Sequence, residues 1–242
     1  MDYSNFKIDM PNDVEFIINT IKSHGHQAYA VGGCVRDSIM GLTPNDWDIT
    51  TSALPSDIKE YFNKTIDTGI EHGTVTVMLH NVGYEVTTYR IDGEYKDGRH
   101  PSSVEFSDRL TDDLCRRDFT INAMAYNNIT GLVDEYGGID DINNRIIKCV
   151  GNPIERFTED ALRMMRAIRF SAQLGFTIEP DTFKAIEKLN RNIDKVSMER
   201  VCVELKKTLL SDNPDYCSLY ATTGLFNNIL PVIADNLTGR YA

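Results

Sequence analysis

The spacing of the apolar residues changes near residue 150, and this change constrains the fold more than any other feature. Upstream of it, short runs rich in β-branched and aromatic residues have the length of buried strands. These runs are residues 28–31, 48–51, 74–79 and 84–89. Downstream of Pro153, the apolar residues recur at helical spacing. We therefore predict an α+β fold with two domains: residues 1–150 with a mixed, largely antiparallel sheet, and residues 151–242 entirely helical.

Local signals place individual elements within these domains. Residues 13–23 carry apolar side chains at helical spacing, and residues 81–83 (Asn-Val-Gly) are typical of the turn of a β-hairpin. Thr158 is a plausible N-cap for a helix over residues 159–174, which Gly175 is expected to end. The sequence therefore predicts strands first and long helices afterwards.

The composition excludes several classes of protein. With 242 residues, of which 41% are hydrophobic, the chain can bury a core in one large or two small domains. The net charge of −11 excludes a protein that coats nucleic acid through a broadly basic surface, so any contact with RNA has to be local. The five cysteines form no CxxC pair, which predicts reduced thiols rather than a zinc site. No signal sequence or membrane-spanning run is present, which predicts a soluble, cytoplasmic protein with no membrane partner.

A glycine pair follows the first predicted strand. Gly32 and Gly33 connect this strand to a predicted helix, and the N–H groups at such a helix start suit a triphosphate. Arg36 lies one turn along the helix and adds positive charge. An isolated glycine pair is more often an ordinary strand-to-helix turn, so this signal depends on its neighbours.

Paired carboxylates follow at Asp46 and Asp48. On a strand, residues two apart share one face, so both carboxylates point the same way while Trp47 points into the core. Two such close carboxylates stay ionised together when a cation lies between them, and Mg²⁺ is the natural candidate. Glu85 on a later predicted strand is a candidate third carboxylate, or alternatively an exposed edge residue. A lone Asp-x-Asp is more often a solvated turn, so its spacing from the glycine pair carries the prediction.

Three ordered motifs resemble one known family. The glycine pair, Arg36 and the Asp46-x-Asp48 sequence look like motif A of the polymerase-β-like nucleotidyltransferases, in the version found in class II tRNA nucleotidyltransferases and bacterial poly(A) polymerases. Residues 116–126 are similar to motif B of this family, and residues 159–169 to its base-selecting motif. The resemblance implies a polymerase-β-like catalytic head over residues 1–150 and a helical neck over residues 151–242, without the body and tail domains usual in the family.

The resemblance also implies roles for individual residues. In the head it implies that Asp46 and Asp48 are metal ligands, that Glu85 is a third catalytic carboxylate, and that Gly33, Arg36, Arg117 and Asp118 bind the nucleotide. In the neck it implies that Asp160 and Arg163 select the base and that Arg166 and Arg169 contact the nucleotide or its phosphates.

The base-selecting role also has a physical basis. On a continuous helix Asp160, Arg163, Arg166 and Arg169 would share one polar arc. Cytosine and adenine each present an amine donor beside a ring-nitrogen acceptor, which a carboxylate and a guanidinium can match. Guanine and uracil present the reverse pattern and would leave polar groups unpaired, at a cost of about 1–3 kcal/mol each. The alternative interpretation of this arc is a solvated helix face.

The implied function is template-independent addition of CMP and AMP, as CCA, from CTP and ATP to the 3′ end of tRNA by two-metal transfer with Mg²⁺. Residues 92–103, which are rich in Gly, Asp, Lys, Arg, His, Pro and Ser, are predicted to form a loop. The resemblance implies that this loop helps the site switch from C to A, because relatives that add only CC have the region shortened or altered, and its presence favours complete CCA addition over CC-only addition. A-only addition and poly(A) synthesis stay open, because the same base-selecting pair serves them. Nucleotide transfer to a small molecule stays open as well, as does an inactive nucleotide- or RNA-binding module. The sequence does not predict the oligomeric state.

Overall fold

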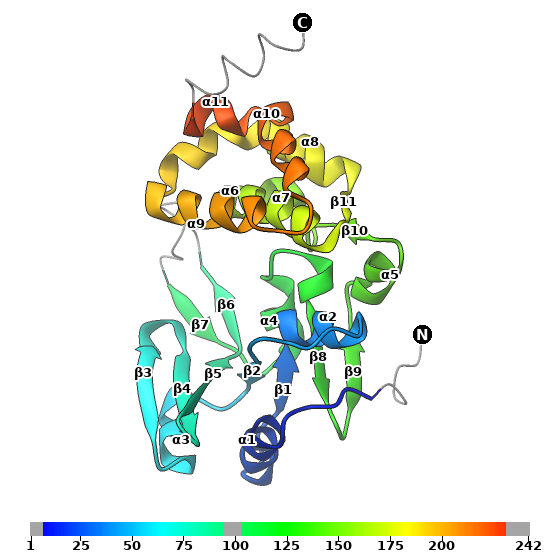
Figure 1. Ribbon diagram of the computed structural model, residues 1–242. Helices are drawn as coiled ribbons and strands as arrows, with labels where there is room; N and C mark the ends of the chain where they lie inside the picture. The colour runs from blue at the N-terminus through cyan, green and yellow to red at the C-terminus, as the bar shows by residue number, and fades with distance from the viewer. Residues whose placement is uncertain (1–6, 94–102, 231–242) are drawn as a thin grey trace, which may run out of the picture. The chain divides into compact units, whose positions relative to one another are not determined.

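The computed structural model describes residues 7–93 and 103–230, which divide into two compact units (Figure 1). The first unit comprises the described residues up to Gly93 together with Ser103–Ile142, and the second begins at Asn143. Most of the loop predicted after Asp92, namely residues 94–102, lies outside the described residues. No helix in the described ranges is both long and apolar enough to cross a membrane.

The first unit contains a seven-stranded sheet in the order β3-β4-β5-β2-β1-β8-β9. Its strands are β1 (Ala28–Val31), β2 (Asp48–Thr51), β3 (Thr65–Gly69), β4 (Thr74–Leu79), β5 (Val82–Thr88), β8 (Met124–Asn127) and β9 (Gly131–Asp134). Every neighbouring pair is antiparallel except β2 and β5, which run parallel. The predicted mixed, largely antiparallel sheet is therefore confirmed.

Short helices and a small second sheet complete this unit. The helices are α1 (Asn12–Ser23), α2 (Gly33–Ile39), α3 (Pro55–Tyr61), α4 (Leu110–Cys115) and α5 (Gly138–Asn143), with 3₁₀ turns at Ile70–His72 and Thr120–Asn122. The second sheet pairs β6 (Arg90–Asp92) with β7 (Val104–Phe106). Helix α2 packs against β1 and β8, so the glycine pair at its start is fixed to the centre of the large sheet.

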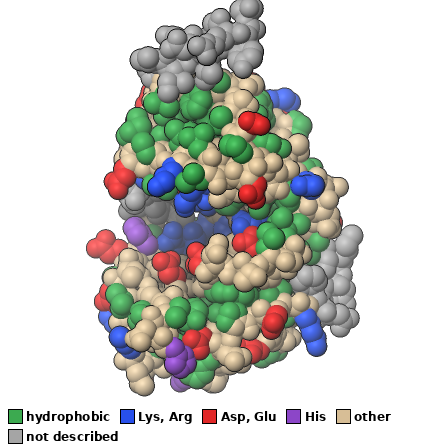
Figure 2. All heavy atoms as spheres, in the orientation of Figure 1, with side chains coloured by type: hydrophobic (Ala, Val, Ile, Leu, Met, Phe, Trp, Pro, Cys, Tyr) green, Lys and Arg blue, Asp and Glu red, His purple; other side chains and the backbone are tan. Residues whose placement is uncertain are grey.

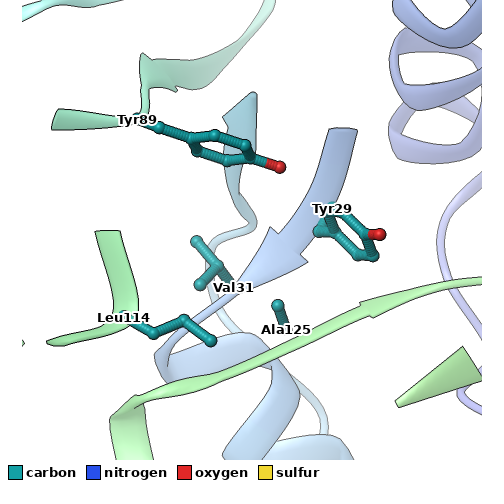
Figure 3. Close-up of a cluster of buried hydrophobic side chains, with 5 residues drawn as sticks. All are labelled: Tyr29, Val31, Tyr89, Leu114 and Ala125. Atoms are coloured by element: carbon teal, nitrogen blue, oxygen red, sulfur yellow. The ribbon is translucent and has the colours of Figure 1, made fainter. Parts of the chain in front are cut away.

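A buried cluster holds α4 against the large sheet (Figure 3). It consists of Tyr29, Val31, Tyr89, Leu114 and Ala125. Leu114 belongs to α4, whereas Val31 and Ala125 are paired residues of β1 and β8. The hydroxyl of Tyr89 is buried without a hydrogen-bond partner in the described residues, and burial raises the pKa of this phenol far above its usual range. The cluster therefore fixes α4, and with it the residues around Leu114.

The predicted hairpin of β4 and β5 is confirmed, but the position predicted for its turn is wrong. Leu79 pairs with Val82, so the turn consists of His80 and Asn81 rather than residues 81–83. Both turn residues have positive φ, at 50° and 66°. Two successive residues of this kind match the right-handed twist of the flanking strands, and Gly83 becomes part of β5.

The second unit is built from helices with one short pair of strands. Its helices are α6 (Pro153–Glu159), α7 (Leu162–Leu174), α8 (Pro180–Leu189), α9 (Met198–Leu209), α10 (Ser218–Thr222) and α11 (Leu225–Ile229), with 3₁₀ turns at Asn190–Lys195 and Pro214–Cys217. The parallel pair of β10 (Ile146–Ile147) and β11 (Thr177–Ile178) corrects the prediction that this part is entirely helical. Figure 2 shows hydrophobic side chains on the surface of this unit, and α9 carries exposed Met198, Val203 and Leu209.

The predicted helix over residues 159–174 is interrupted near its start. Helix α6 ends at Glu159, and Asp160 has the extended angles φ −137° and ψ 105°. The Oδ1 atom of Asp160 accepts a hydrogen bond from the N–H of Leu162, at 3.0 Å, where α7 begins. Aspartate competes with the helix for backbone donors in this way, so Asp160 rather than Thr158 serves the start of α7. Gly175 ends α7 in the left-handed conformation, as predicted.

Candidate active site

The three predicted carboxylates come together around the start of β2, although Asp46 lies just before this strand and not on it as predicted. Strands β2 and β5 pair with Ile49 opposite Val86, which places Asp48, the first residue of β2, beside Glu85 in the middle of β5. Asp46, Asp48 and Glu85 all line one cavity of about 600 Å³. The other lining residues are Pro11, Pro44, Asn45, Trp47, Val82, Gly83 and Tyr84. The parallel pairing, which sequence spacing does not reveal, therefore gathers these carboxylates at one opening.

The electrostatics of Asp48 suit a bound cation. Its side chain faces solvent in the cavity, yet the surrounding protein still disfavours the charged form: burial raises its pKa to about 6. Arg117 opposes this shift, while the carboxylates of Asp46 and Glu85 add to it. A divalent cation would relieve the repulsion between these groups.

The donor set fits a cation that arrives with a phosphate ligand. Within the described ranges no group of three or more His, Cys, Asp or Glu side chains is arranged to hold a metal ion by itself. Asp46 and Asp48 are two carboxylates, and Mg²⁺ typically binds one or two carboxylates together with phosphate oxygens and water. A triphosphate would therefore have to supply the remaining ligands.

The glycine pair lies beside the arginines of the first unit. Gly32 has φ 83°, and a Cβ atom added there would lie 3.0 Å from Nη1 of Arg117. Gly33 is the first residue of α2, and a Cβ atom at Gly33 would lie 3.7 Å from Nη2 of Arg36. The turn therefore needs glycine at position 32 for two reasons, its backbone conformation and the closeness of Arg117.

A buried hydrogen-bond network connects two predicted nucleotide-binding residues. Arg36 donates through Nη1 to Oδ1 of Asn122 at 2.7 Å, and Nδ2 of Asn122 donates to Oδ1 of Asp118 at 3.2 Å. Arg36 also donates from Nε and Nη2 to Asp37, at 2.8 and 2.6 Å. Sequence reasoning missed Asn122, although its place inside the motif B segment was a usable signal. All four predicted nucleotide-binding residues of this unit lie near the start of α2.

We expect Gly32→Ala to weaken nucleoside triphosphate binding at least about tenfold, because the new methyl group displaces the guanidinium of Arg117. Gly25→Ala is the matched control, since Gly25 also has positive φ, at 89°, but nothing lies within 4 Å of its added Cβ atom. Gly25→Ala should lose about 1–2 kcal/mol of stability because of its positive φ. Gly32→Ala should lose more, because φ 83° with ψ −130° is a conformation that residues other than glycine rarely adopt. Titration with CTP and thermal melting separate the effects, and equal affinities in the two variants would contradict this prediction.

The predicted base-selecting residues lie in the second unit, and each is held by another partner. Asp160 accepts a hydrogen bond from Nη2 of Arg200 at 2.9 Å. Arg163 donates through Nη1 to Oε2 of Glu159 at 2.8 Å. Asp160 therefore does not lie on the same helix face as the arginines, and its carboxylate is oriented by α9 instead of by the helical repeat.

The other two predicted arginines contact one aromatic ring. The Cζ atoms of Arg166 and Arg169 lie 5.3 and 3.9 Å from the ring centroid of Phe170. Arg169 is buried, and its Nε atom lies 2.8 Å from Oε2 of Glu204 on α9. Arg169 thus has a structural ion pair, while Arg166 is half-buried. Arg200 and Glu204 were missed because nothing in the local pattern of α9 shows which distant charges they meet.

Two family models match the chain. The family described as Poly A polymerase head domain matches residues 28–148, and the family described as probable RNA and SrmB-binding site of polymerase A matches residues 175–237. The CCA-adding enzyme of Ligilactobacillus salivarius is 49% identical over 218 residues, covering 85% of this chain and 54% of that enzyme. The CCA-adding enzyme of Leuconostoc mesenteroides is 47% identical over 219 residues, covering 90% and 55%. The chain spans about half the length of these curated relatives.

Solved structures agree with these matches. The CCA-adding enzyme of Bacillus stearothermophilus in complex with CTP has a TM-score of 0.82 and 44% identity, covering 90% of this chain and 53% of that one. A CCA-adding enzyme in complex with ATP has a TM-score of 0.75 and 26% identity, covering 91% and 52%. Since the head-domain match alone spans half of the sequence, the chain belongs to the poly(A) polymerase and CCA-adding enzyme family of nucleotidyltransferases.

Proposed function

We propose that this chain adds CMP and AMP, as CCA, from CTP and ATP to the 3′ end of tRNA without a template. The observation that carries the proposal is the cavity lined by Asp46, Asp48 and Glu85, with the pKa of Asp48 raised to about 6. Family membership supports it, as do relatives named CCA-adding enzymes and similar structures that contain CTP or ATP. Residues 1–150 would be the catalytic head and residues 151–242 the neck.

In this proposal the first unit positions the phosphates and the attacking hydroxyl. Asp46 and Asp48 would hold Mg²⁺, which supplies activation of the 3′-hydroxyl and charge stabilisation of the leaving pyrophosphate. Arg36 and Arg117 add positive charge near the start of α2, where the triphosphate would bind. Asp118, held by Asn122, would orient the sugar of the incoming nucleotide.

The second unit would select the base. Asp160 would accept from the exocyclic amine of cytosine or adenine, and Arg163 would donate to the neighbouring ring nitrogen. Arg200 and Glu159 hold these two side chains and lower the entropy lost when a base binds. Arg166 would contact the nucleotide near Asp160 and Arg163. Arg169 would have to contact the nucleotide while it stays paired with Glu204. The cytoplasmic location stays a prediction.

The test is incubation of the chain with Mg²⁺ and a tRNA that lacks its terminal CCA, with each labelled nucleoside triphosphate supplied singly and then CTP with ATP. Growth by C, C and A, without use of GTP or UTP, is the expected result on a sequencing gel. Growth that ends after CC, addition of A alone, or a long A tail would each replace the proposed specificity. Nucleotide binding without any growth would favour the inactive binding module.

A further inference from the structure

Asp113 is a charged residue without solvent-exposed surface, and its carboxylate is fully engaged. The side chain is 0% exposed. Arg116 donates to Oδ1, from Nε at 3.0 Å and from Nη2, while Arg117 donates to Oδ2 through Nη2 at 3.1 Å. Thr50 adds a hydroxyl hydrogen bond to Oδ2, also at 3.1 Å. Burial is the largest effect on the pKa of Asp113 and raises it, but the two arginines together outweigh burial and lower the pKa overall.

The partners of Asp113 connect it to the candidate active site. Thr50 lies on β2, two residues after Asp48, and is itself buried. The guanidinium of Arg117 lies against the turn at Gly32. The next residue, Leu114, is part of the buried cluster of Figure 3, so the backbone that carries Asp113 is fixed to the large sheet. One buried carboxylate therefore ties the strand that carries Asp48 to a predicted nucleotide-binding arginine.

Arg117 depends on this single anchor. Among the described residues, Asp113 is the partner to which its guanidinium donates, and its Nε atom is buried without an acceptor. Arg117 is also close enough to Asp48 to lower the pKa of that carboxyl group. Without Asp113, the guanidinium of Arg117 would be attracted to the carboxylate of Asp48, which it already influences. An ion pair between Arg117 and Asp48 would make the guanidinium less available to the phosphates of the nucleotide. It would also make the carboxylate less available to the metal ion.

We propose that Asp113 is a positioning residue whose carboxylate holds Arg117 at the Gly32 turn, prevents it from pairing with Asp48, and keeps it available to a bound nucleoside triphosphate. This inference rests on the proposed function. It assigns no contact with the substrate to Asp113, which acts only through Arg117.

The test uses Trp47, the only tryptophan of the chain, which lines the cavity between Asp46 and Asp48. Its fluorescence is followed while CTP is added with Mg²⁺ in the absence of RNA. Asp113→Asn keeps the shape of the side chain but removes its charge, and it is expected to raise the dissociation constant of CTP about tenfold. In the transfer assay, the KM for CTP should rise by a similar factor with kcat changed less than about threefold, because the lost interaction concerns binding.

A double-mutant cycle with Arg117→Ala separates positioning from general support of the fold. If Asp113 acts through Arg117, then adding Asp113→Asn to Arg117→Ala changes the dissociation constant by less than about twofold. The inference would be overturned if Asp113→Asn raised the dissociation constant by the same factor with and without Arg117→Ala. An unchanged affinity for CTP in Asp113→Asn would overturn it as well. An unmodified chain that fails to bind CTP would overturn the proposed function and this inference together, so the two failures are distinguishable.

If Asp113→Asn does not fold, a milder pair of variants tests the role of Asp113. Thr50→Val removes the hydroxyl that lies 3.1 Å from Oδ2 of Asp113 and 3.3 Å from the carbonyl oxygen of Thr87. Thr51→Val, the matched control, removes a buried hydroxyl of the same strand that donates to the carbonyl of Gln27 instead. Thr50→Val is expected to weaken CTP binding about threefold and Thr51→Val to leave it unchanged, at similar melting temperatures. Equal affinities in these two variants would overturn the inference.

Discussion

Replacing Asp48 by asparagine is expected to lower the rate of nucleotide transfer at least about a thousandfold while raising the melting temperature of the metal-free protein at neutral pH. The rate falls because the amide cannot replace a carboxylate as a ligand of the divalent cation. The stability rises because the charge of Asp48 is unfavourable in the folded chain, where burial, Asp46 and Glu85 all disfavour ionisation. Activity and stability should therefore change in opposite directions.

The pH dependence follows from the same carboxyl group. Its pKa is raised from the ordinary 3.8 to about 6, so the folded chain binds more protons than the unfolded chain between these values. The stability that this group contributes is present below about pH 4 and is lost as the pH rises through about 6. The melting temperature of Asp48→Asn should thus exceed that of the unmodified protein, and the difference should grow as the pH rises from about 4 to about 6.

Asp67→Asn is the matched control for Asp48→Asn. Asp67 lies in the same unit and forms an exposed ion pair with Lys59, away from the cavity-lining residues. Its replacement should leave the transfer rate unchanged and alter the melting temperature little, because an exposed ion pair contributes little to stability. Transfer assays with Mg²⁺ and melting curves in a chelator measure both quantities. Transfer retained in Asp48→Asn would contradict the metal assignment, and a lower melting temperature would contradict the electrostatic account.

The strands and most helices follow local patterns and could be predicted from the sequence. Strands β1, β2 and β4 have the predicted bounds because β-branched residues and strand-length runs mark them directly. The hairpin turn differed because two left-handed residues fit the strand twist better than a glycine two positions later. The helix over residues 159–174 differed because the Asp160 side chain binds a backbone N–H and interrupts the repeat.

The partners of the candidate site residues could not be predicted, because they come from distant parts of the chain. Asp113 meets Thr50 across 63 positions, and Asp160 meets Arg200 across 40. Periodicity shows which face of a helix is polar but not which charge another element presents to it. The carboxylates Asp48 and Glu85 could be named from their positions, whereas their closeness depends on the parallel pairing of β2 with β5.

Replacing Asp160 by alanine is expected to reduce the preference for CTP and ATP over GTP and UTP about tenfold to a hundredfold. In the intact chain, a guanine or uracil would leave the carboxylate of Asp160 facing an acceptor, at a cost of about 1–3 kcal/mol. Without this carboxylate the penalty disappears, while the favourable contact with cytosine and adenine is lost as well. Arg163→Ala should act in the same direction through the second contact.

Single replacements test this base selection better than an exchange of the two residues. An arginine at position 160 would face Arg200, and an aspartate at position 163 would face Glu159, so the exchange would place like charges together. Asp181→Ala is the control, because Asp181 forms an exposed ion pair with Lys184 in the same unit. Single-nucleotide incorporation with each of the four triphosphates measures the ratios of kcat/KM. Because Asp160 and Arg163 are already held by Arg200 and Glu159, an unchanged preference in both alanine variants would mean that these ion pairs are structural and that other residues read the base.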